Sequence, residues 1–158
     1  METTNKYYTP TIEELHDGFE IELNGKGVEG LNWFKRIVQP DEIVLYAMYI
    51  DPRRMSWFDV KMGIVPKPEH NIRVKYLDKE DIESLGWEYV EDRGMSENYG
   101  YSFLKEVSFL SGGNAYYKLR YWTPNNRLRI EVIGSPTFDG TIKNKSELKV
   151  LLKQLGID

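Results

Sequence analysis

The sequence predicts an α+β domain built on a largely antiparallel sheet of about seven or eight strands with two short helices. Three observations lead to this prediction. Short segments rich in β-branched and aromatic residues recur along the chain, most connections between them are short, and only two segments carry complete helix signals. The 158 residues contain no repeat or linker-like tract, so a single domain over residues 1–158 is expected.

The N-terminal half is predicted to begin with a flexible segment over residues 1–10 and a single helical turn or bridging segment over 11–15. Residues 19–23 alternate apolar and acidic side chains and predict a half-buried strand, with Glu20 and Glu22 on its solvated face. A second strand is expected within 31–38. The apolar, partly β-branched run Ile43–Ile50 is interpreted as a central strand.

The remaining elements follow from the same patterns. Residues 72–77 predict a strand, after which Asp78 caps a short helix over about 78–85. Further strands are expected at the segments 87–90, 101–110, 115–122 and 127–133, the last two forming a hairpin around 123–126.

The C-terminal segment carries the clearest local signals. A final strand precedes Asn144, which is placed as the N-cap of a helix over about 145–155, with Glu147 as its capping-box partner. Four leucines at i, i+3, i+4 and i+7 form one apolar stripe, and Gly156 is placed to end the helix. We expect this stretch to be the natural end of a soluble domain.

Composition excludes several classes of site. The chain has no cysteine, which removes disulfides, thiol nucleophiles and cysteine-ligated metals. Its two histidines, His16 and His70, are isolated, so no metal site is expected. Neither a phosphate-binding loop nor a serine-nucleophile motif is present, so no catalytic residue and no cofactor are predicted.

Charge and hydropathy bear on partners and location. A net charge of −4 argues against nucleic-acid binding, and no apolar run has the length of a membrane helix. We expect no membrane association and a cytoplasmic location. The oligomeric state is left open.

Aromatic residues make up 13% of the chain, and some of them alternate with basic residues. Such mixtures suit protein-binding hot spots or recognition of a nucleotide-like ligand, although an ordinary outer sheet face gives the same pattern. The candidate binding residues are Arg53, Arg54 and Trp57 in an expected loop, and Tyr116, Lys118, Arg120 and Trp122 on one face of an expected strand.

Two stretches resemble a known group of proteins: residues 71–87 (NIRVKYLDKEDIESLGW) and 127–157, which contains FDGTIKNKSELKVLLKQLGI. They are similar to small proteins encoded by phages and mobile elements of gut Bacteroidota, and residues 8–15 also fit the usual start of that group. The group has no assigned activity. The resemblance implies a phage or mobile-element origin and a bacterial host cytoplasm, and it supplies no chemistry.

The preferred hypothesis is therefore a non-enzymatic interaction protein that binds a host protein, for example a defence protein that it inhibits. One alternative is a binding protein or enzyme for a small nucleotide-like ligand that uses the Arg/Tyr/Trp face. Another alternative is a minor virion component.

Overall fold

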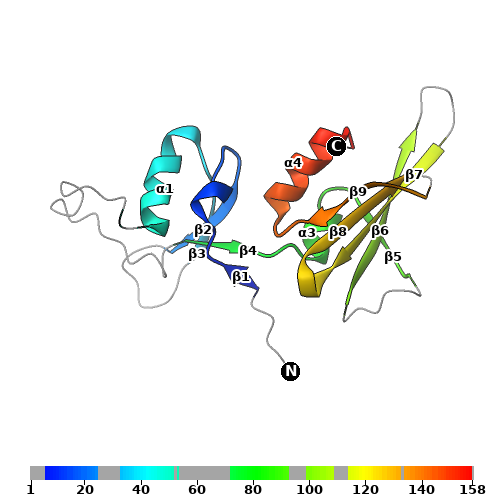
Figure 1. The fold of residues 1–158 in the computed structure, drawn as a ribbon, viewed down its shortest axis with the longest axis horizontal. Coiled ribbons are helices and arrows are strands. Elements are labelled where there is room, and N and C mark those ends of the chain that lie inside the picture. Colours follow the sequence, from blue (N-terminus) through cyan, green and yellow to red (C-terminus); the bar gives the residue numbers. More distant parts are fainter. Residues whose placement is uncertain are drawn as a thin grey trace. The chain divides into compact units, whose positions relative to one another are not determined.

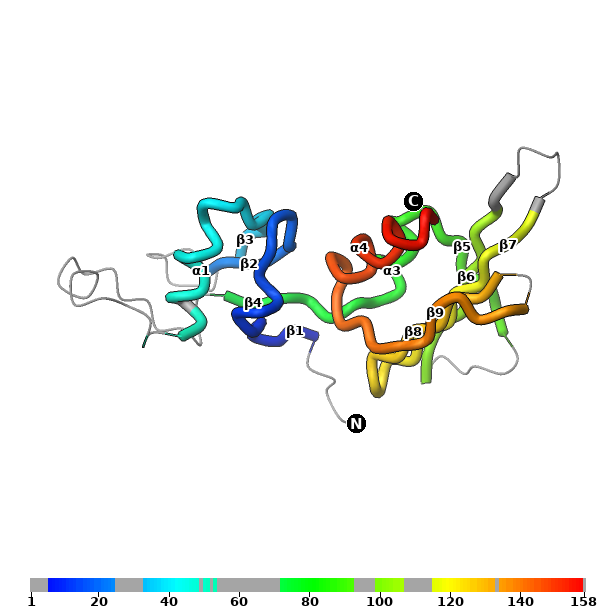
Figure 2. Tube along the Cα trace, turned by 45° about the horizontal axis from the view of Figure 1, so that its top comes forward, coloured from blue at the N-terminus to red at the C-terminus, as the bar shows by residue number. Residues whose placement is uncertain are grey.

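The computed structural model describes most of the chain, which divides into two compact units, Met1–Tyr76 and Leu77–Asp158. Each unit has its own sheet (Figures 1 and 2). Each also has its own cluster of buried apolar side chains. The described residues are 6–24, 33–51, 53, 72–92, 99–108, 114–132 and 134–157.

The first unit contains a four-stranded antiparallel sheet in the order β1-β4-β2-β3. Within the segment predicted to be flexible, residues 7 and 8 form a short strand that pairs with β4, and Lys6 accepts a hydrogen bond from the Tyr76 amide. The elements in chain order are β1 (Tyr7–Tyr8), η1 (Ile12–Glu14), β2 (Glu20–Asn24), β3 (Trp33–Ile37), η2 (Pro40–Glu42), α1 (Ile43–Ile50) and β4 (Ile72–Lys75).

Strand β2 forms where the alternation of apolar and acidic residues predicted it. Phe19 and Ile21 are buried, whereas Glu20 and Glu22 are directed to the other face and remain partly exposed. The register places Ile21 opposite Arg36 and Glu22 opposite Lys35 on β3. The period-two pattern therefore fixed which face of this strand enters the core.

The strand prediction for Ile43–Ile50 is wrong, because this segment is the helix α1. A helical turn at η2 precedes it, in which Pro40 occupies the first turn and the Glu42 carboxylate accepts a hydrogen bond from the Gln39 amide. Its core-facing residues are at i, i+3, i+4 and i+7, which is a helical stripe. Because the residues between them are also apolar, the helical spacing could not be recognised from the sequence. The stripe consists of Ile43, Tyr46, Ala47 and Ile50.

The second unit contains a five-stranded antiparallel sheet in which the strands follow chain order, from β5 to β9. Long antiparallel pairings join β6 to β7 and β7 to β8, while a register irregularity between Ile130 and Glu131 interrupts the β8–β9 pairing. The elements are α3 (Lys79–Glu83), β5 (Glu88–Val90), β6 (Gly100–Ser108), β7 (Asn114–Trp122), η5 (Thr123–Asn125), β8 (Arg127–Val132), β9 (Ser135–Thr141) and α4 (Lys145–Leu155).

Both helices of this unit lie on one face of its sheet (Figure 1). The larger core cluster lies between the helices and this face. Alternate strand residues such as Phe103, Leu119 and Leu128 are buried against Ile82 of α3 and Leu148 of α4. We call the opposite face of this sheet the outer face.

The helices predicted over about 78–85 and 145–155 are confirmed as α3 and α4. The Asp78 side chain accepts a hydrogen bond from the Asp81 amide, and the Asn144 side chain accepts one from the Glu147 amide. Gly156 ends α4 with a φ of +67°, a conformation in which glycine is favoured because it lacks a Cβ.

The predicted hairpin is confirmed as well. Strands β7 and β8 pair across residues 117–132, and the turn between them ends at Asn126, which has a φ of +53°. Asparagine tolerates this left-handed conformation better than most residues. The Asn126 side chain accepts a hydrogen bond from the buried Tyr121 hydroxyl, which ties the turn to the core.

The α+β class with antiparallel sheets is thus confirmed, with nine strands among the described residues in two sheets, where one sheet of about seven or eight was expected. A single domain over 1–158 stays a prediction. In the described part of the chain, no helix has the length and apolar character required to cross a bilayer.

Candidate functional site on the outer face of the five-stranded sheet

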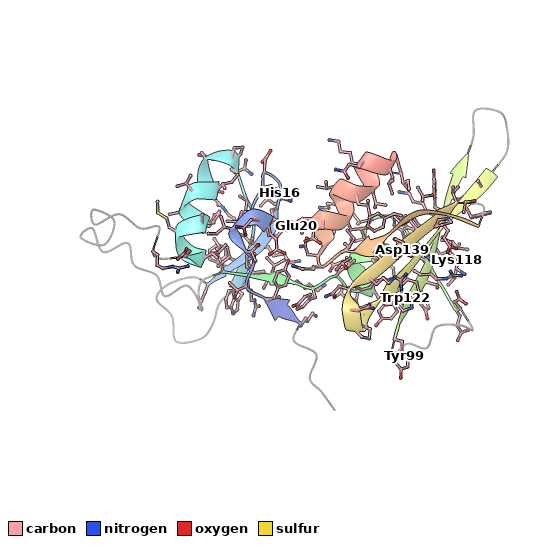
Figure 3. All side chains as sticks on the ribbon, in the orientation of Figure 1. His16, Glu20, Tyr99, Lys118, Trp122 and Asp139 are labelled. Atoms are coloured by element: carbon pink, nitrogen blue, oxygen red, sulfur yellow. The ribbon has the colours of Figure 1, made fainter. Side chains whose placement is uncertain are left out.

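The structure places four of the predicted binding residues on the outer face of one central strand, β7. Tyr116, Lys118, Arg120 and Trp122 alternate with the inward-facing Tyr117, Leu119 and Tyr121, of which the last two are buried. Figure 3 labels Lys118 and Trp122 on this strand and Asp139 on β9.

The other three predicted residues do not join this face in the structure. Arg53 belongs to the first unit, where its guanidinium pairs with Asp51 at 2.8 Å and is largely exposed. Arg54 and Trp57 lie outside the described residues. The candidate site is therefore built from the second unit alone.

An ion-pair network crosses the outer face from β7 to β9. Lys118 pairs with Asp92 at 2.8 Å, and Arg120 lies between Asp92 at 3.4 Å and Glu131 at 3.2 Å. The network continues through Arg129, whose guanidinium approaches Glu131 at 3.6 Å and Asp139 at 2.8 Å. It ends at Arg127, which donates hydrogen bonds to Asp139 through Nε and Nη2, both at 2.8 Å.

The centre of the network is a pair of like charges. The sheet register places Arg120 directly opposite Arg129 on neighbouring strands, an arrangement that repels unless anions separate the two groups. Glu131 supplies such an anion, because one of its carboxylate oxygens lies within 3.6 Å of both guanidinium groups. Partly exposed ion pairs at such distances each contribute little to the free energy of unfolding. We therefore interpret their main effect as holding the arginine side chains in position.

Asp92 anchors the other side of the network. It follows β5, and its carboxylate also accepts a hydrogen bond from the buried Ser102 hydroxyl at 3.1 Å. Ser102 on β6 lies opposite Arg120 on β7, so one carboxylate links residues of two neighbouring strands. The Lys118 ammonium and the Arg120 guanidinium are therefore both held by the same carboxylate oxygen of Asp92.

Aromatic groups flank the network. The Arg127 guanidinium lies 5.6 Å from the centroid of the Trp122 ring, directly across the strand pair, which is within the range of a cation–π interaction. Tyr116 lies on the same face of β7 and is 52% exposed. The outer face therefore combines guanidinium groups with accessible aromatic surface, the mixture common in binding hot spots.

The groups of the network whose pKa values are shifted lie at its β9 end. Hydrogen bonds from Arg127, and to a lesser extent from Arg129, lower the pKa of Asp139 from 3.8 to about 2. The same bond raises the pKa of Arg127. This corner is charged at neutral pH, with Arg127 and Asp139 forming a bidentate pair.

Sequence reasoning missed the residues that complete the network. The signal was present, because Arg127, Arg129 and Glu131 alternate with the apolar residues Leu128 and Ile130, which the structure buries in the core. The outward residues of β8 could have been added to the site by the same period of two. Asp92 and Asp139 carried no comparable signal, since their approach depends on strand pairing.

Sequence reasoning also missed a second cluster, on the four-stranded sheet. The Arg73 guanidinium on β4 lies 3.6 Å from the Tyr7 ring centroid and 4.0 Å from that of Trp33, and it pairs with Glu22 at 2.7 Å. The four residues come from all four strands. Because the guanidinium is enclosed by groups of its own unit, we interpret the cluster as a structural clamp across the sheet.

The remaining chemistry of the described residues is limited. Groups of three or more carboxylate or histidine side chains that could hold a metal ion do not occur among them. On the outer face, the available chemistry is hydrogen-bond donation by guanidinium and ammonium groups and stacking on aromatic rings.

Comparisons of the chain with protein-family models, with curated proteins and with solved structures found no match.

Proposed function

We propose that the protein is a non-enzymatic interaction protein that binds another protein through the outer face of its five-stranded sheet. The observation that carries the proposal is the combination, on this face, of an ordered array of guanidinium groups with the exposed Tyr116 and the partly exposed Trp122. Both helices of the unit pack on the opposite face, so among the described residues of this unit no helix covers the outer face.

The fixed positions of the charges favour a protein partner. Side chains held by neighbours lose less conformational freedom on binding, and tyrosine, tryptophan and arginine dominate the energetics of protein interfaces. The outer face carries both positive and negative charges, which is complementary to a protein surface that presents both carboxylates and cations. The order of these charges also determines which orientation of the partner is electrostatically favourable.

The resemblance to phage and mobile-element proteins suggests the class of partner. A protein of such an element acts inside a bacterial host cell, so a host protein is the partner that we propose, with a defence protein that is inhibited by binding as the specific form of the hypothesis.

A nucleotide-like ligand is a weaker candidate for this face. Its phosphate groups would approach Lys118 and Arg120, but both cations are already paired with Asp92, and Arg120 also with Glu131. A phosphate there would encounter two carboxylates, which costs Coulombic energy at short range.

The experiment that tests the proposal is affinity capture from host lysate, followed by direct binding measurements with the purified partner. We expect the double variant Arg120→Ala/Trp122→Ala to weaken binding by about tenfold or more, as loss of hot-spot residues does. Lys149→Ala, an exposed residue of α4, is the matched control and should bind as the wild type does. If the double variant remains folded and its affinity is unchanged, the outer face is not the binding surface.

A further inference from the structure

We draw no further inference here: the strongest candidate, the edge of the five-stranded sheet formed by the mostly exposed strand β9, carries nothing, because the Leu77 amide already donates to the Lys143 carbonyl beyond one end of this strand, Pro136 supplies no amide donor near the other, and nothing among the described residues shows what would pair with the backbone between them.

Discussion

At the scale of single residues, Arg73 shows how one side chain can connect a whole sheet. Its guanidinium lies between the rings of Tyr7 and Trp33 and pairs with Glu22, so it contacts residues of the three other strands of its sheet. Strand β1 has only two residues and pairs with β4 alone, so side-chain contacts of this kind matter for holding it in place.

We predict that Arg73→Ala lowers the free energy of unfolding by about 2 kcal/mol, because two cation–π contacts and a charge-assisted hydrogen bond are lost and Glu22 remains without its cation. Urea denaturation measures this change. Arg53→Ala is the control, since that exposed arginine pairs, among the described residues, with the nearby Asp51, and it should leave stability unaltered. Equal stability of the two variants would contradict the clamp.

Asp139 gives a pH dependence with a defined sign. Its pKa is about 2 in the folded chain and 3.8 as the ordinary value, so the folded state prefers the ionised carboxylate. A depressed pKa contributes stability above pH 3.8, and this contribution is lost as the pH falls toward 2. We predict that Asp139→Asn flattens the fall in urea-denaturation stability between these two pH values.

Arg127→Gln should reduce the same slope, because the hydrogen bond from Arg127 is the largest cause of the depressed pKa. A slope in both variants identical to that of the wild type would show that Asp139 is not the group responsible.

At the scale of elements, α1 illustrates how the same residues suit two structures. Its run of eight residues is apolar almost throughout, which favours a buried strand or a helix equally well. Two features of the structure favour the helix. The turn at η2 leads into the segment with helical geometry, and the core-facing side chains of α1 recur with helical spacing. Val44, at 64% exposure, is an apolar side chain on the solvent side of this helix.

The helix can be distinguished from a strand by a pair of substitutions. In a strand, Leu45 and Ala47 would share a face, whereas in α1 Leu45 is exposed and Ala47 is buried. We predict that Leu45→Lys changes the free energy of unfolding by less than about 0.5 kcal/mol and that Ala47→Lys lowers it by about 2 kcal/mol or more. Similar losses in both variants, measured by urea denaturation, would favour a strand.

At the scale of the whole molecule, the chain has two compact units with separate cores. The larger cluster draws all of its buried members from Leu77–Asp158, and the smaller one draws all of its members from Met1–Tyr76. A unit that contains its entire core has the main requirement for folding independently, although a small domain has limited stability.

We therefore predict that a fragment of residues 77–158 folds without the first unit and unfolds cooperatively on heating, as measured by circular dichroism. Leu128→Ala in the same fragment should lower its unfolding free energy by about 3 kcal/mol, because Leu128 is fully buried in the core. A fragment that lacks a cooperative transition would support instead the single domain expected from the sequence.

The sequence by itself determined the local elements and the faces of the strands. Asp78 and Asn144 mark helix starts through hydrogen bonds to amides three residues away, and the alternation along β2 and β7 sorts side chains between core and surface without reference to the rest of the chain. These signals are local, so they could be identified correctly before the structure was known. Four of the seven candidate binding residues, those of β7, were placed on one face in this way.

Only the tertiary structure decided which strands are neighbours and hence which charges meet. Asp92 and Arg120 are separated by twenty-eight residues, and Arg127 and Asp139 by twelve, yet each pair is in contact because strand pairing brings them together. The helical state of Ile43–Ile50 and the division into two sheets depend likewise on packing between distant segments. Burial and pairing act between residues far apart in the chain, so local patterns cannot specify them.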